Sequence, residues 1–174
     1  MRKFLSLFTA ILFAGSMMAA DLTVDFESPA DSYADWVFTT FTSQKTNSNV
    51  PAHGGSYFGN TDGKTSGSVV TAEKVNPSSI TFYVSKQSTN TTASYWLVKV
   101  SEDGSNWTQV DDPQSAASGI TRGQWTEVTR DLSNYSDVYV GIFYQGTSAV
   151  RCIDDIALSL AEGGDDPQPT TYNL

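Results

Sequence analysis

The fold is decided by two neighbouring stretches in the middle of the chain, Ile80-Thr81-Phe82-Tyr83-Val84 and Tyr95-Trp96-Leu97-Val98-Lys99-Val100. Both are short and rich in β-branched and aromatic residues, and the break between them is rich in Ser, Thr and Asn. β-Branched and aromatic residues are enriched in strands, whereas Ser, Thr and Asn are common in the turns between them. The two stretches therefore predict β-strands.

The same pattern continues on both sides of this centre. Near the start, Leu22, Val24 and Phe26 alternate with polar residues, which is the period of a half-buried strand. Further strand-like segments lie at residues 69–70, 107–110, 125–128, 138–144 and 150–160. The Asp-Gly pair within Glu102–Asn106 predicts a tight hairpin turn, because these residues readily adopt positive φ angles.

No helical repeat persists for three turns between Asp21 and Leu160. Short strands at this spacing are typical of a two-sheet antiparallel β-sandwich, and the jelly roll is the favoured topology. We therefore expect one all-β domain over residues 21–160.

The first twenty residues have the features of a secretory signal peptide. Arg2 and Lys3 give a positive start, residues 4–14 are mostly apolar, and small residues follow at positions 15–20. The apolar run is shorter than the roughly 20 residues that span a bilayer. We expect a protein that is secreted to the extracellular space or the cell surface, without membrane insertion.

After Leu160 the composition changes to that of a linker. Residues 161–174 carry Gly, acidic residues and Pro without apolar periodicity, which predicts a hydrated, extended segment. Two interpretations stay open: a frayed tail, or a linker to a partner domain beyond the C-terminus.

The charge balance narrows the classes of partner. The chain has a net charge of −9, and removing residues 1–20 leaves eight basic residues against nineteen acidic ones, or about −11. Such a surface repels phosphate backbones and anionic headgroups, so nucleic acid is not an expected partner. Cys152 is the only cysteine; no internal disulfide can form, and its apolar neighbours predict a buried thiol.

Catalysis is difficult to assemble from these residues. One histidine, His53, and one cysteine exclude zinc sites that need several such ligands. Asp154 and Asp155 are adjacent, and neighbours in a regular strand point to opposite faces. Asp25 or Glu27 paired with Asp154 stays open as a carboxylate pair. The chain is predicted not to be an enzyme.

The same acids suit calcium better. Asp25 and Glu27 end the first strand, Asp154 and Asp155 lie in the last, and these strands often lie close together in a jelly roll. Calcium takes six to eight oxygen ligands. We predict a structural calcium with Glu27 and Asp155 as preferred ligands. The alternative is that the aspartates only cap a strand edge or accept backbone N–H groups.

Aromatic side chains are the candidates for ligand binding, because sugars stack their C–H faces on such rings. Most of the 21 aromatic residues are needed for a core. Tyr33 and Trp36 lie in an early segment that reads as irregular, and Tyr57 follows the Gly54–Gly55 loop. These three residues are predicted to form a binding surface, with a place at the edge of the core as the alternative.

The order of several motifs resembles a known family. These motifs are Asp25-Phe26-Glu27, the Ser101–Trp107 hairpin, Asp131-Leu132-Ser133-Asn134-Tyr135 and Ile153-Asp154-Asp155-Ile156. Together they resemble secreted Bacteroidetes jelly-roll modules of the choice-of-anchor, cleaved-adhesin and MAM-like type, which are related in shape to galactose-binding-like carbohydrate-binding modules. The resemblance implies an accessory module, and a calcium joining Glu27 to Asp155.

Three functional hypotheses follow. The leading one is a non-catalytic binding or adhesion module with a glycan or cell-surface polysaccharide as ligand. The second is a structural spacer or sorting-associated module that positions a partner domain. The third and least favoured is a small hydrolase that uses carboxylates.

Overall fold

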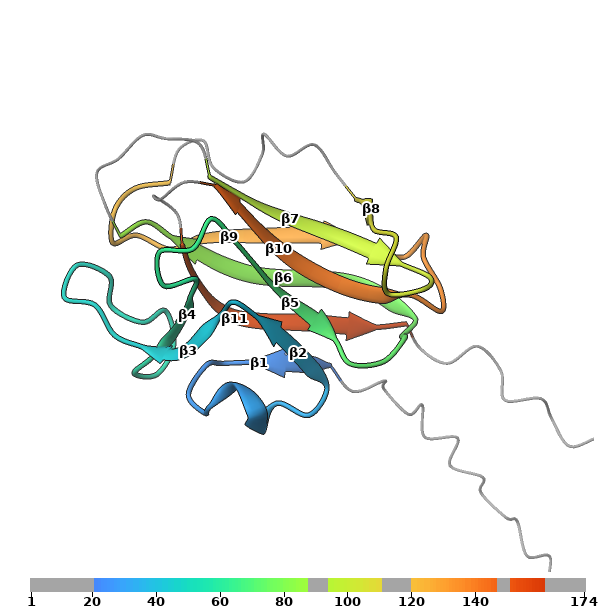
Figure 1. Cartoon of the computed structure of the whole chain (residues 1–174), viewed down its shortest axis with the longest axis horizontal. Helices are drawn as coiled ribbons and strands as arrows, with labels where there is room; N and C mark the ends of the chain where they lie inside the picture. The colour runs from blue at the N-terminus through green and yellow to red at the C-terminus, as the bar shows by residue number, and fades with distance from the viewer. Residues whose placement is uncertain (1–20, 88–93, 111–119, 147–150, 162–174) are drawn as a thin grey trace, which may run out of the picture.

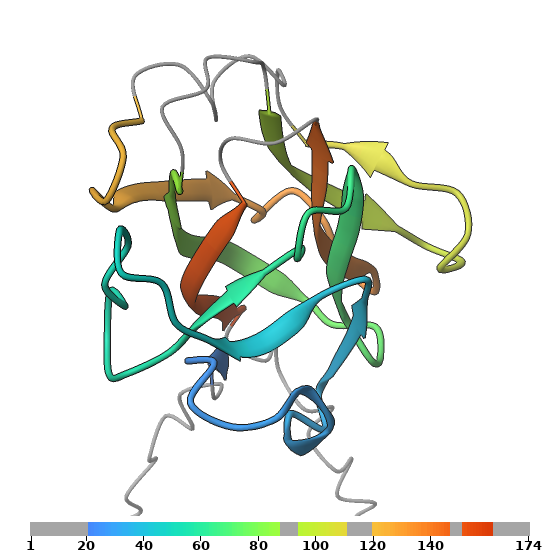
Figure 2. The ribbon, with the colours of Figure 1, turned by 60° about the vertical axis from the view of Figure 1, so that its left-hand side comes forward.

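Two antiparallel sheets pack face to face in the computed structural model (Figure 1 and, from another side, Figure 2). The structure describes residues 21–87, 94–110, 120–146 and 151–161. The six-stranded sheet has the order β3 (Thr42–Lys45), β4 (Phe58–Asn60), β11 (Cys152–Leu160), β6 (Pro77–Ser85) and β9 (Thr126–Asp131), and β1 (Leu22–Val24) also pairs with β11. The five-stranded sheet has the order β2 (Trp36–Thr39), β5 (Ser66–Thr71), β10 (Tyr139–Gly146), β7 (Ser94–Ser101) and β8 (Thr108–Gln109). A 3₁₀ turn, η1 (Ala30–Ser32), precedes β2.

The core lies between the sheets and follows the alternation in the sequence. In β6, Ile80, Phe82 and Val84 are fully buried, so Thr81 and Tyr83 point outward. Val140 and Ile142 of β10 are equally buried on the facing sheet. A smaller buried cluster of Val50, Phe58 and Cys152 lies beside this core, with Trp125 packed against it. The predicted all-β sandwich is confirmed.

The last strand holds the six-stranded sheet together. β6 pairs with β11 from Cys152 to Leu160, along one edge. The other edge is shared: β4 pairs with Cys152 and Ile153, and β1 pairs with Ile156 to Leu158. In the gap between β4 and β1, β11 carries a bulge after Asp154, and Asp155 has a left-handed φ of 45°.

The hairpin predicted at Glu102–Asn106 joins β7 to β8. Gly104 has a φ of 73°, and the Asp103 carboxylate accepts the N–H groups of Ser105 and Asn106. These bonds hold the pKa of Asp103 far below its usual range.

Three strands in the first third of the chain differ from the sequence prediction. β2 begins at Trp36, in the segment expected to be irregular, and β3 and β4 follow it. β3 reads Thr-Ser-Gln-Lys and β4 has three residues, so neither shows apolar alternation. The predicted signal peptide at residues 1–20 and the segment at 162–174 lie outside the described residues. Among the residues that the structure describes, no helix is long and apolar enough to span a membrane.

The two ends of the domain lie side by side. Leu22, at the start of β1, is in register with Leu158, near the end of β11, and the strands run antiparallel (Figure 1). Ala161 then donates its N–H to the carbonyl of Asn76. The chain therefore enters and leaves the sandwich at the same end.

Cys152 gives a direct test of this core. Its side chain is fully buried, and burial raises the pKa of its thiol to about 12, so the thiol stays protonated at pH 8. We expect Ellman's reagent to label the native protein at pH 8 at least roughly 10³-fold more slowly than the unfolded protein, because the unfolded fraction is that small. Since Cys152 is the only cysteine, the absorbance reports this site alone. Labelling of native protein as fast as in denaturant would contradict the buried position.

Candidate functional site

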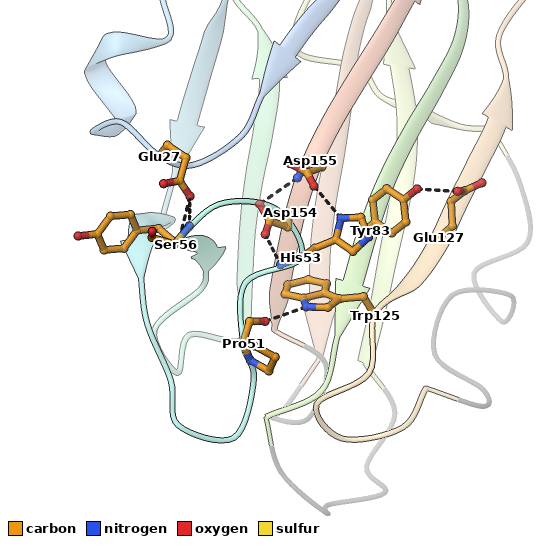
Figure 3. Close-up of polar contacts among 10 residues, drawn as sticks. Glu27, Pro51, His53, Ser56, Tyr83, Trp125, Glu127, Asp154 and Asp155 are labelled. Atoms are coloured by element: carbon orange, nitrogen blue, oxygen red, sulfur yellow. Dashed lines mark hydrogen bonds and ion pairs between the residues drawn. The ribbon is translucent and has the colours of Figure 1, made fainter.

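Carboxylates from both ends of the domain meet one loop in the gap between β1 and β4 (Figure 3). Glu27 lies three residues beyond β1, Asp154 and Asp155 come from the bulge of β11, and residues 53–57 lead into β4. We call this set of residues the acidic junction.

The carboxylates of the acidic junction bind the loop backbone. Ser56 and Tyr57 both donate their N–H groups to Oε1 of Glu27, at 2.8 Å each. His53 donates its N–H to Oδ2 of Asp154 at 2.9 Å, and its ring Nδ1 lies 2.6 Å from Oδ2 of Asp155. Asp154 and Asp155 were expected to point to opposite faces. This is wrong because the left-handed φ of Asp155 in the bulge breaks the regular alternation, and both carboxylates contact His53.

Two glycines allow this close approach. A Cβ on Gly54 would lie 2.8 Å from a carboxylate oxygen of Asp155. A Cβ on Gly55, which has a φ of 58°, would overlap the carboxylate of Glu27. The loop therefore needs glycine at both positions, for space and at Gly55 also for the left-handed backbone.

Asp154 has the least solvated carboxylate of the junction. It is fully buried, and desolvation raises its pKa to about 7, although the N–H groups of His53 and Asp155 favour the charged form. Asp25 behaves in the opposite way. Tyr33 donates its hydroxyl to Oδ1 of Asp25 at 2.6 Å, and this bond lowers the pKa of Asp25.

Aromatic rings fix the loop to the six-stranded sheet. The His53 ring stacks on Tyr83 with centroids 3.7 Å apart and an interplanar angle of 18°. Trp125 meets His53 edge-on at 6.0 Å and donates its Nε1–H to the carbonyl of Pro51 at 2.8 Å. Tyr83 in turn donates its hydroxyl to Glu127 (Figure 3). Sequence reasoning missed this stack, because a loop histidine gives no signal of its partner 30 residues away.

The donor chemistry of the acidic junction fits calcium, since Glu27 and Asp155 offer hard oxygens on two sides of one loop. In the part of the chain that the structure describes, no group of three or more His, Cys, Asp or Glu residues is arranged to hold a metal ion. The predicted calcium therefore stays a prediction. The carboxylates accept N–H groups here, which was the alternative function foreseen for the aspartates.

Trp36 cannot take part in the predicted ligand surface of Tyr33, Trp36 and Tyr57. Trp36 is only 5% exposed and belongs to the core, because it occupies an inward position of β2 opposite Thr71. Tyr33 packs against the core edge with its hydroxyl on Asp25, and Tyr57 is half-buried beside Glu27. Trp36 therefore offers no face to a ligand, and the alternative position at the core edge describes these residues better.

A different set of aromatic residues lies on the outer face of the five-stranded sheet. Val69, Val140 and Ile142 point into the core, so the residues that alternate with them point outward. One outward row runs in register across the sheet through Val37, Val70, Gly141 and Lys99. The next row runs through Thr39, Ser68, Phe143 and Leu97. We call these two rows, with Trp107 and Tyr139, the aromatic face.

Phe143 is the centre of the aromatic face. A Cβ on Gly141 would lie 2.6 Å from the Phe143 ring, so glycine lets the ring lie down across its neighbour. Trp107 meets the same ring edge-on at 4.8 Å. Val37 is 52% exposed, and among the described residues it is the one exposed large apolar side chain.

Two hollows open on either side of Phe143. The first has a volume of about 340 Å³ and is lined by Val37, Val70, Trp107, Tyr139 and Phe143 together with small polar residues. The second has a volume of about 330 Å³ and is lined by Leu97, Lys99, Phe143 and Gln145 among others. Because they share Phe143, the two hollows form a shallow track across the sheet.

No protein-family profile and no curated protein matches the sequence. Solved structures do match the fold. A cleaved adhesin domain of Lys-gingipain has a TM-score of 0.58 at 18% identity, covering 81% of this chain and 100% of that one. A second such domain, from Porphyromonas gingivalis, has a TM-score of 0.58 at 20% identity, covering 80% and 97%. The xylan-binding domain of Paenibacillus barcinonensis Xyn10C has a TM-score of 0.55 at 13% identity, covering 82% and 95%.

These likenesses show the fold. The chain has the sandwich architecture of cleaved adhesin domains and xylan-binding modules, and the resemblance found in the sequence is confirmed at this level. The function of the chain has to be argued from its own surfaces.

The contribution of Glu27 to the acidic junction can be measured. We expect Glu27→Ala to lower the free energy of unfolding by about 1–3 kcal/mol, because the N–H groups of Ser56 and Tyr57 lose their acceptor. Amide hydrogen exchange at these two residues should accelerate. Glu73→Ala, which removes an exposed carboxylate outside the junction, is the control. Equal effects of the two variants would contradict a specific role for Glu27.

Proposed function

We propose that this chain is a non-catalytic, secreted binding module and that the aromatic face is its glycan-binding site. The observation that carries the proposal is the first hollow, where Trp107, Tyr139 and Phe143 lie together on an open sheet surface. The three rings are half-buried, and partly exposed rings along a shallow track suit flat, extended ligands.

The chemistry of the hollow fits a sugar. Pyranose rings present C–H faces that pack on aromatic and aliphatic side chains, while their hydroxyls need hydrogen-bonding groups at the rim. The first hollow supplies both, with Trp107 and Val70 on its apolar side and Thr39 and Ser68 as hydroxyl groups. The shared fold with a xylan-binding domain supports the same ligand class.

The position of the chain ends favours a pendant module over a spacer. A spacer that sets the distance between two domains needs its ends far apart, whereas Leu22 and Leu158 are paired neighbours here. A module attached by one end keeps its outer sheet face accessible. The hydrolase hypothesis loses its main candidate, since Asp154 is fully buried and bonded to the loop.

A glycan array tests this proposal. We expect the purified protein to bind a plant or bacterial polysaccharide, and Trp107→Ala to weaken that binding about fivefold or more, since stacking of a sugar on one aromatic ring is of the order of 1 kcal/mol or more. Trp125→Ala is the matched control, because Trp125 is also half-buried but lies at the acidic junction. Circular dichroism establishes that both variants fold.

The outcomes separate the possible sites. Loss of binding with Trp107→Ala alone supports the aromatic face. Loss with Trp125→Ala alone keeps the glycan ligand but moves the site to the loop of His53. A folded wild-type protein that binds no glycan contradicts the proposal.

We also propose that calcium stabilises the acidic junction. Glu27 and Asp155 are the preferred ligands, with Asp25 and Asp154 as further candidates. The ion would supply positive charge beside the buried carboxylate of Asp154 and the half-buried carboxylates of Glu27 and Asp155. Such an ion would join the strand that opens the domain to the strand that closes it.

Calcium is tested by thermal unfolding in about 10 mM calcium chloride and in chelator, because extracellular calcium modules have Kd values of about 10⁻⁴ to 10⁻³ M. At about ten to a hundred times its Kd the ion stabilises the protein by about 1.4 to 2.7 kcal/mol, which raises Tm by several degrees for a domain of this size. Asp155→Asn should abolish the difference, and magnesium chloride is the control for ionic strength. The same Tm in calcium and in chelator would contradict the site.

A further inference from the structure

We infer that the aromatic face selects polysaccharides that carry carboxylates, such as uronic acid polymers, and that Lys99 is the residue that reads this charge. The inference rests on the proposed glycan-binding function and names the class of glycan.

Lys99 lines the second hollow of the proposed track, next to the Phe143 ring that both hollows share. In β7 it is in register with Gly141 of β10, and the glycine lets the Phe143 ring lie across that position. Its ammonium Nζ lies 5.0 Å from the centroid of the Phe143 ring, within the range of a cation–π interaction. The ring that separates the two hollows therefore also holds the cation beside them.

The ammonium group of Lys99 has no carboxylate partner among the residues that the structure describes. Lys45 and Lys74, by contrast, pair with Asp62 at 2.7 Å and with Asp137 at 3.0 Å. Lys64 and Lys86 also have no ion pair among the described residues, so what distinguishes Lys99 is the position of its ammonium group over the Phe143 ring. A half-buried ammonium on an apolar floor is partly desolvated, so it gains more from an incoming carboxylate than an exposed lysine would.

The surroundings of Lys99 explain why its positive charge would act on a bound sugar. Its neighbours in the second hollow are Ser66, Leu97, Phe143, Tyr144 and Gln145, and none of them carries a charge. The acidic excess of the whole chain repels anionic polymers, but salt at physiological concentration screens charges beyond about 8 Å. A sugar bound in the second hollow would therefore meet mainly the electrostatic field of the Lys99 ammonium group.

Matched acidic and neutral polymers test the inference. The probes are polygalacturonate, alginate and glucuronoxylan, each compared with the same polymer after its carboxyl groups have been reduced to alcohols. We expect the wild-type protein to bind at least one acidic polymer about tenfold or more tightly than its reduced form, the ratio that corresponds to one charge-assisted hydrogen bond. Lys99→Met should remove most of that preference, and Lys99→Arg should retain it.

Lys64→Met is the control, because it removes the same charge from an exposed residue outside the aromatic face. Equal affinity for acidic and reduced polymers, or a preference that survives Lys99→Met, would overturn the inference and leave glycan binding intact. Failure to bind any acidic or neutral polymer would instead contradict the proposed function itself. Circular dichroism and Tm identify any variant that does not fold, and Lys99→Gln, which also removes the charge, then replaces Lys99→Met.

Discussion

The structure depends on one constraint, which is that β11 must pair with three other strands. β6 occupies one of its edges completely, so β1 and β4 have to share the other. Pairing with β4 ends at Ile153, and pairing with β1 begins at Ile156. The two residues between these points are Asp154 and Asp155, and they have no strand partner on that edge. The acidic junction is therefore the place where the sheet changes partners.

Buried or half-buried backbone groups need hydrogen bonds wherever a sheet is interrupted. At the acidic junction, carboxylates supply the acceptors that a neighbouring strand would otherwise offer, and the N–H groups of His53, Ser56 and Tyr57 use them. The ring of His53 then covers Tyr83, so the same loop also protects the outside of the sheet. The first strand, the loop and the last strand are joined at one point, although they are far apart in the sequence.

The fold class could be predicted because each core strand carries its own local signal, the alternation of apolar and polar residues. Ile80, Phe82 and Val84 alternate with polar residues in the sequence, and all three are buried in the structure. The neighbouring positions of the first and last strands were also foreseen, because these strands often lie close together in a jelly roll. Trp36 was misplaced because its strand has only four residues, and a single tryptophan does not reveal which face it occupies. The aromatic face was missed for a related reason: Trp107 and Phe143 are 36 positions apart, and only the register of β7, β8 and β10 brings them together.

The two outer faces of the sandwich differ in how far their side chains already interact with one another. On the six-stranded sheet the outward polar groups pair with one another, as Thr81 does with Thr129 at 2.9 Å and Tyr83 with Glu127 at 2.7 Å. The five-stranded sheet instead exposes Val37 and leaves an apolar track whose one cation contacts a ring. A surface whose groups already satisfy one another gains little from a ligand, whereas apolar area and a partly desolvated charge gain from being covered. This asymmetry is the physical reason for proposing that the six-stranded sheet stabilises the domain and that the five-stranded sheet binds the ligand.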